Sequence, residues 1–108
     1  MQYILNAPSR LDATVKLPAS KSISNRALII HALSKGNMLP ANLSVCDDTE
    51  VIVNAMMYKP DTIDIKAAGT AMRFMTAYLA VTPGEHTITG TERMKQRPIK
   101  ILVDALRY

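Results

Sequence analysis

Basic and hydroxyl side chains gather at the start of an otherwise apolar segment. Lys21, Ser22 and Arg26 stand directly ahead of the run ALIIHAL. On a helix, residues four apart share one face, so Ser22 and Arg26 would lie together. The first turn of a helix also offers unpaired N–H groups and the positive end of the dipole. These groups predict a phosphate site; a plain serine cap with solvated basic residues is the alternative.

A second set of such residues lies in the segment AAGTAMR, where a predicted strand ends and a predicted helix begins. Gly69 allows a close approach of backbone, Thr70 can cap the helix, and Arg73 lies one turn in. The segment has neither the Lys-Ser/Thr ending of a nucleotide P-loop nor the glycines of a dinucleotide fingerprint. It is interpreted as an anion site, with an ordinary glycine turn as the alternative.

The third set is TERMKQRP, in which Arg97 precedes Pro98, a favourable first residue for a helix. A cation at the amino end of a helix opposes the dipole and is unfavourable for stability. It becomes favourable when an anion occupies that helix end. The alternative is a solvated basic loop.

Other polar residues are interpreted as structural. Asp47 or Asp48 is predicted to cap a helix, and His31 and His86 have neither a nucleophile pattern nor metal-ligand spacing. The single Cys46 excludes an internal disulfide and a cysteine-based zinc site. The methionines are assigned to the core.

Composition narrows the class of protein. The chain has 108 residues, 48% of them hydrophobic and 20% charged, which is typical of a folded domain. Its net charge of +4 comes without basic runs or interleaved aromatics, which argues against a nucleic-acid partner and favours a small acidic ligand. No window is apolar enough for a membrane span, and the N-terminus resembles no targeting peptide. A cytoplasmic location is therefore expected.

Periodicity predicts an α/β chain in which strands and helices alternate. A faint repeat with a period near 48 relates Gly36 to Gly84 and Arg26 to Arg73, which suggests βαβ-type units. Because the second copy stops at Tyr108, the chain is expected to be part of something longer. The predicted strands are 2–7, 12–17, 62–68 and 85–90, with an extended 38–45, and the predicted helices are 22–35, 47–59, 69–81 and one from 98 onward.

Three motifs, in order, carry a family resemblance: LPASKSISNRALI, AGTAMR and ERMKQRPI…LVDAL. The chain resembles the N-terminal part of the 5-enolpyruvylshikimate-3-phosphate synthase (3-phosphoshikimate 1-carboxyvinyltransferase) family. The resemblance implies transfer of the enolpyruvyl group of phosphoenolpyruvate to the 5-hydroxyl of shikimate 3-phosphate, with release of phosphate and without metal or organic cofactor. It also implies a fold of two similar domains, each an inside-out, barrel-like α/β assembly of three βαβαββ-type units. Residues 1–108 would supply about one and a half units.

The resemblance also implies roles for individual residues. Lys21 would contact both substrates, and Ser22 and Arg26 would bind shikimate 3-phosphate. The phosphoenolpyruvate site would use the backbone of Gly69, the supporting side chains of Thr70 and Arg73, and direct binding by Arg97. Three departures stand out: Ala67 replaces the usual Asn, which bears on sensitivity to glyphosate-like mimics, Phe74 replaces a frequent Pro, and the span between Asp48 and Gly69 is short.

The acid/base residues of the family come from later sequence, so this chain alone is expected to be inactive. Residues 1–11 would pair with the absent distal domain, and the exposed edges favour self-association of a chain whose full-length form would be monomeric. One alternative is an enolpyruvyl transferase acting on a UDP-sugar, which would normally show Lys-Asn at Lys21-Ser22. The others are a non-catalytic domain that binds phosphorylated metabolites and a purely structural piece.

Overall fold

The computed structural model describes residues 1–108 as five helices and two short strands. All four predicted helices are present, and a fifth, short one was not predicted. None of the helices has the length and apolar character needed to cross a membrane. The elements in chain order are α1 Lys21–Leu33, α2 Asp47–Tyr58, β1 Thr62–Asp64, α3 Gly69–Ala80, β2 Thr87–Thr89, α4 Glu92–Lys95 and α5 Lys100–Leu106.

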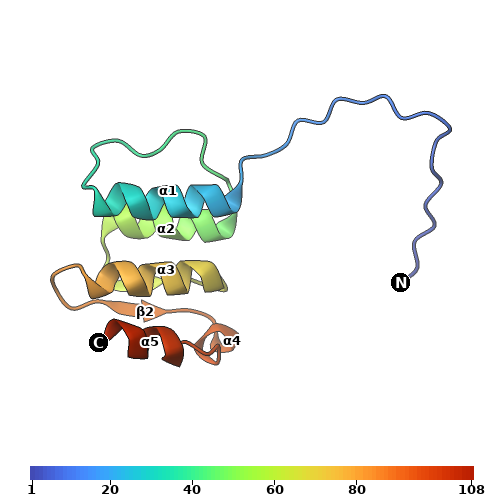
Figure 1. Ribbon diagram of the computed structural model, residues 1–108. Coiled ribbons are helices and arrows are strands. Elements are labelled where there is room, and N and C mark those ends of the chain that lie inside the picture. The colour runs from blue at the N-terminus through green and yellow to red at the C-terminus, as the bar shows by residue number, and fades with distance from the viewer.

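Helices α1, α2 and α3 run in the same direction (Figure 1). Their carboxyl-terminal halves line one common cavity, and the first residues of α1 and α2 are joined by an ion pair between Lys21 and Asp48. Local signals set where α1 begins: the hydroxyl of its N-cap Ser20 accepts a hydrogen bond from the Ile23 N–H at 3.3 Å. The three amino-terminal ends therefore lie at one edge of the body.

The strands β1 and β2 form a two-stranded parallel sheet with α3 as the crossover. Ile63 of β1 pairs with Ile88 of β2, and the turn that follows β1 brings the chain to Gly69 at the start of α3. This is a βαβ unit, as the alternating pattern of the sequence predicts. The predicted strands 62–68 and 85–90 are correct in place but shorten to three residues each.

The hydrophobic core lies between α1, α2, α3 and the sheet. Leu28 of α1, Ile52 of α2 and Met75 of α3 are almost completely buried, as is Ile65 after β1. Packing among aliphatic side chains therefore holds the three helices parallel. The assignment of all methionines to the core is wrong in part: Met72, Met75 and Met94 are buried, but Met1, Met38 and Met57 are exposed.

The predicted strands 2–7 and 12–17 are not formed in this chain, and the expected pairing of residues 1–11 with a distal domain stays a prediction. Residues 1–19 carry no strand, and Tyr3, Leu5, Val15 and Leu17 are each more than 70% exposed. The segment leaves the body as an extended arm (Figure 1). The alternating pattern is present, but a strand needs a hydrogen-bonded neighbour, and none lies beside the arm.

The region before the last helix also differs from its prediction. The last helix begins at Lys100 with Ile99 as its N-cap, two residues later than the predicted start at Pro98. The basic segment before it contains α4, whose N-cap Thr91 accepts from the Met94 N–H at 3.3 Å. Buried Met94 anchors this short helix to the core.

Candidate anion-binding edge

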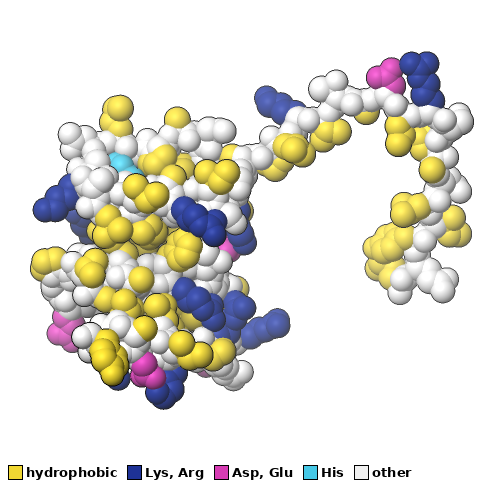
Figure 2. All heavy atoms as spheres, in the orientation of Figure 1, with side chains coloured by type: hydrophobic (Ala, Val, Ile, Leu, Met, Phe, Trp, Pro, Cys, Tyr) yellow, Lys and Arg dark blue, Asp and Glu magenta, His cyan; other side chains and the backbone are white.

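The first turns of α1, α2 and α3 form one edge of the body, here called the amino edge. Lys and Arg side chains gather at this edge and beside it, over the region of α4 (Figures 1 and 2). Neither α1 nor α3 has an acidic residue in its first turn, whereas α2 has Asp47, Asp48 and Glu50. The dipole ends of α1 and α3 are therefore not neutralised by their own side chains.

The α1 part of the amino edge carries the predicted residues Lys21, Ser22 and Arg26. Arg26 folds back along its helix, and its Nη1 donates to the Ser22 carbonyl oxygen at 3.2 Å. Lys21 turns toward α2, with its Nζ 3.0 Å from Oδ2 of Asp48. All three residues are exposed, so their charges and the Ser22 hydroxyl are accessible to a ligand.

The α3 part of the amino edge is formed by two arginines around Gly69. Arg73 Nη1 donates to the Gly69 carbonyl oxygen at 3.1 Å, and its Nη2 donates to the Pro98 carbonyl oxygen at 3.0 Å. The Arg97 guanidinium lies against Gly69, where an added Cβ would overlap with Nη1 and lie 3.0 Å from Cζ. Thr70 is exposed in the same turn. Four predicted residues are thus brought together at one helix start.

The position of Arg97 corrects the prediction made for it. The sequence places this arginine at the amino end of the last helix, but α5 begins only at Lys100. Its side chain reaches the start of α3 instead, because the Arg73 bond to the Pro98 carbonyl holds this segment over α3. Two helix starts, rather than three, therefore carry the candidate anion site.

Arg26 and Arg73 have the same local geometry. Each lies one turn into its helix and donates through Nη1 to the carbonyl four residues earlier, at 3.2 and 3.1 Å respectively. The helices α1 and α3 thus present equivalent arginines at the amino edge. The predicted repeat itself stays a prediction.

A buried polar network behind the amino edge was not found by sequence reasoning. Thr49 of α2 donates to Oδ1 of the fully buried Asn25 at 2.8 Å, and the Ser44 N–H donates to Oγ of Ser24, also at 2.8 Å. The Asn25 Nδ2 has no hydrogen-bond partner. These contacts join residues at least 20 apart in the chain, and no local pattern reports them.

Two pKa shifts occur where α1 and α2 begin. The pKa of Lys21 is raised above its ordinary value, first by the hydrogen bond with Asp48 and then by the charge of Asp48. Burial lowers this pKa by a smaller amount, and the charge of Cys46 raises it slightly. Burial raises the pKa of the Cys46 thiol, but hydrogen bonds with Ser44 and Thr49 outweigh it, so that pKa is lowered. Both shifts favour the charged form of the group.

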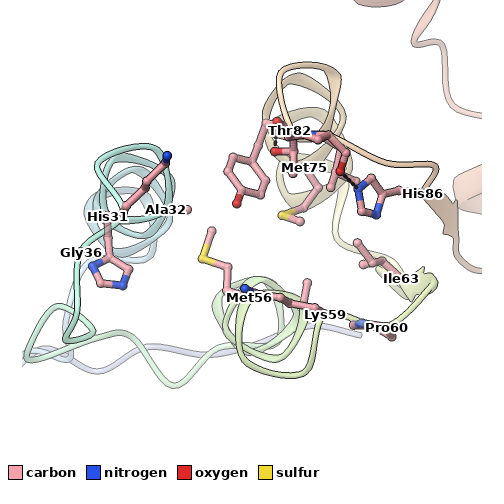
Figure 3. A pocket seen from close by; sticks show the side chains of 15 residues that line it. His31, Ala32, Gly36, Met56, Lys59, Pro60, Ile63, Met75, Thr82 and His86 are labelled. Atoms are coloured by element: carbon pink, nitrogen blue, oxygen red, sulfur yellow. Dashed lines mark hydrogen bonds between the residues drawn. The ribbon is translucent and has the colours of Figure 1, made fainter.

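A cavity of about 640 Å³ lies at the opposite end of the three helices. His31, Met56 and Met75 line it together with His86, whose Nε2 lies 3.3 Å from the Pro83 carbonyl oxygen (Figure 3). Lys59 lines it at the end of α2, where a cation complements the negative end of the helix dipole. None of the predicted site residues lines this cavity.

No group of three or more His, Cys, Asp or Glu side chains is arranged to hold a metal ion. Apart from the carboxylates of α2, the amino edge offers guanidinium, ammonium, hydroxyl and backbone N–H groups. All of these are hydrogen-bond donors suited to phosphate and carboxylate oxygens.

Comparisons with known proteins identify the family. The model of the family EPSP synthase (3-phosphoshikimate 1-carboxyvinyltransferase) matches residues 5–58 and 54–108. The chain belongs to this family. A 3-phosphoshikimate 1-carboxyvinyltransferase of Bacteroides fragilis is 70% identical over 107 residues, which are 99% of this chain and 26% of that protein. The chain thus spans about a quarter of that relative's length. No solved structure matches.

Two other family members carry extra residues within the matched region. The 3-phosphoshikimate 1-carboxyvinyltransferase of Tolumonas auensis is 38% identical over 125 residues, which cover 92% of this chain and 29% of that protein. The one of Paraburkholderia phytofirmans is 39% identical over 131 residues, which cover 99% of this chain and 30% of that protein. Both matched lengths exceed the 108 residues of this chain, whereas the match to the Bacteroides fragilis protein does not. The two segments of the family match overlap at residues 54–58.

Proposed function

We propose that the amino edge is the part of an enolpyruvyl-transferase site that this chain contributes to a longer protein. That protein would transfer the enolpyruvyl group of phosphoenolpyruvate to the 5-hydroxyl of shikimate 3-phosphate and release phosphate. Membership in the family supports this reaction, and the arginines at the start of α3 support the place of the site.

One observation carries the proposal: the Arg97 guanidinium lies against Gly69 at the positive end of α3, beside Arg73. No acidic residue in the first turn of α3 offsets these cations. Like charges near a dipole end of the same sign destabilise the folded protein. An acidic ligand removes that conflict, because it can accept from both guanidinium groups and from the free N–H groups of the first turn.

The two helix starts suit two different anions. Arg97, Gly69, Thr70 and Arg73 would bind the carboxylate and phosphate of phosphoenolpyruvate at α3. Ser22 and Arg26 would bind the phosphate of shikimate 3-phosphate at α1. Lys21 lies at the start of α1 and is directed toward the start of α2. The family resemblance, rather than this direction, supports a contact of Lys21 with both substrates.

This chain supplies binding groups to the reaction rather than a free acid or base. Asp48 at the amino edge is already hydrogen-bonded to Lys21, and the family's proton-transfer residues would come from the remainder of the longer protein. The chain alone would then be inactive. In the complete domain, the βαβ unit and the equivalent α1 and α3 would be parts of repeated units that surround the parallel helices.

Titration of the chain with each substrate, followed by amide NMR, tests the proposal. Phosphoenolpyruvate should shift resonances at Gly69, Thr70 and Arg73, and shikimate 3-phosphate those of Ser22 and Arg26. Arg97→Ala should weaken phosphoenolpyruvate binding about tenfold or more, because charge-assisted hydrogen bonds contribute about 1.5–3 kcal/mol each. Shifts confined to the far cavity, or none at either helix start, would overturn the proposed site.

Arg93→Ala is the matched control. Arg93 is an exposed arginine of α4, in the same basic segment, and no hydrogen bond or ion pair joins it to α3. Its removal lowers the net charge by the same amount as Arg97→Ala. Equal weakening by the two variants would show a nonspecific charge effect and contradict the role of Arg97.

A further inference from the structure

The ion pair between Lys21 and Asp48 joins a flexible cation to a fixed anion. The Lys21 side chain is 50% exposed, but the Asp48 side chain is only 20% exposed. Their Nζ and Oδ2 atoms lie 3.0 Å apart across two helices, 27 residues apart in the chain. The lysine can move readily, so the aspartate determines where its ammonium group stays.

Several contacts fix Asp48 itself. It lies in the first turn of α2, where the helix dipole favours a carboxylate. The next residue, Thr49, is buried and donates to Asn25 of α1 at 2.8 Å. Ser44, just ahead of α2, donates to Ser24 of α1 through its N–H. The start of α2 is therefore held against the start of α1, and the carboxylate of Asp48 with it.

The ion pair leaves donors free for a ligand. An ammonium group has three N–H donors, and Asp48 accepts from Lys21 through a single oxygen, Oδ2. A free lysine loses side-chain entropy when it is immobilised. A lysine already held by Asp48 has lost part of this entropy before the ligand arrives, which is the advantage of preorganisation.

We propose that Asp48 is a positioning residue that holds the Lys21 ammonium at the amino edge, with its remaining donors available to the anionic substrate. The identity of the substrate in this inference rests on the proposed function, whereas the geometry of the ion pair does not. The opposite role would be that of a competing counter-ion, which the substrate must displace. The two roles predict opposite changes in affinity when the carboxylate is removed.

Asp47 provides a matched control for Asp48. It precedes Asp48 in the same first turn of α2, is exposed, and forms no ion pair. Asp47→Asn and Asp48→Asn remove the same charge from the same helix end. Only the second breaks the contact with Lys21. The difference between the two variants therefore isolates the positioning effect from the loss of charge and from the effect on the helix dipole.

The first readout is the Lys21 side chain, observed by NMR of its Nζ and Cε nuclei. In Asp48→Asn, the pKa of Lys21 should fall and the mobility of Cε should rise, and neither should change in Asp47→Asn. The second readout is phosphoenolpyruvate affinity, which should be about fivefold lower in Asp48→Asn than in Asp47→Asn, as expected for one side chain that must be ordered anew. Asp48→Glu, which keeps the charge, should recover part of the loss.

The outcomes separate the two proposals. Equal or tighter binding by Asp48→Asn than by Asp47→Asn would overturn the positioning role. An unchanged Lys21 pKa and mobility in Asp48→Asn would overturn it as well. If the parent chain binds no phosphoenolpyruvate, the proposed function fails, and the Lys21 readout alone still decides whether Asp48 holds the ammonium. Circular dichroism of both variants shows whether α2 is intact.

Discussion

The start of α2 and the starts of α1 and α3 share one edge but differ in charge. The first turn of α2 has three acidic residues, Asp47, Asp48 and Glu50. The first turns of α1 and α3 have none, and the cations Lys21 and Arg97 lie there instead. Since the three helices are parallel, their dipoles point the same way, and only the side chains distinguish them.

This difference shows which helix starts are stabilised by acidic side chains of the chain itself and which are available to a bound anion. An acidic residue near a helix start typically contributes 0.3–1 kcal/mol, so α2 has its stabilising charges within the chain. The helices α1 and α3 forgo this contribution. The start of α3 gains an equivalent charge only when an anion binds, and the start of α1 has only the Asp48 carboxylate of α2 beside Lys21. This arrangement is expected of a binding edge rather than of a stabilising one.

The largest expected effect comes from a core substitution that destroys the amino edge. Leu28 of α1 is completely buried between α2 and α3. Leu28→Ala should lower the free energy of unfolding by about 2–5 kcal/mol, the usual cost of such a cavity. With that loss the three helix starts no longer share one edge, and anion binding should disappear together with the cooperative urea transition.

Ile30→Ala is the control for this substitution. Ile30 lies on the same helix, but 66% of it is exposed, so its truncation should change stability by about 0.5 kcal/mol or less. A comparable loss in both variants, measured by urea unfolding, would contradict the assignment of the core to the interior faces of α1, α2 and α3.

A smaller effect is expected from giving α3 the charge pattern of α2. Thr70 is exposed in the first turn of α3, so Thr70→Asp places a carboxylate at the helix start. Relative to the isosteric Thr70→Asn, it should raise the free energy of unfolding by about 0.3–1 kcal/mol. It should also weaken phosphoenolpyruvate binding, because the new carboxylate occupies the place of the ligand. If Thr70→Asp is the less stable of the two, the start of α3 is not the electropositive site inferred here.

The three long helices follow from the sequence because their signals are local. Gly69 begins α3 and Ser20 caps α1, close to where the periodicity predicts each helix start. The structure of the arm was not predicted. Alternating apolar residues in 2–7 and 12–17 show which face a strand could bury, but they do not show whether a neighbouring strand is present to pair with it. The start of α4 could have been predicted, because Thr91 is a typical N-cap residue and the acidic Glu92 follows it in the first turn.

The candidate site, like the fold, could be predicted from the sequence only in part. The residue types at Lys21, Arg73 and Arg97 indicate an anion, and local spacing is enough to identify them. Contacts between distant segments decide which helix each residue serves, and the sequence does not report these contacts. Arg97 reaches α3 only because Arg73 binds the Pro98 carbonyl oxygen, and Asp48 becomes the partner of Lys21 only because α1 and α2 lie parallel.

The smallest expected effect concerns pH and tests whether Asp48 serves α1 as well as α2. Asp48 raises the pKa of Lys21 above its unfolded value, so the ion pair stabilises the folded chain fully below that value. This stability is lost as the pH rises through the higher folded pKa, in a window above about pH 10. The difference in unfolding free energy between the parent chain and Asp48→Asn should therefore decrease as the pH rises above about 10. Asp47→Asn, which leaves Lys21 unaffected, should show a constant difference throughout, and tyrosines that titrate in the same range contribute equally to all three proteins. A pH-independent difference for both variants, measured by urea unfolding at each pH, would mean that Asp48 acts only on the dipole of its own helix.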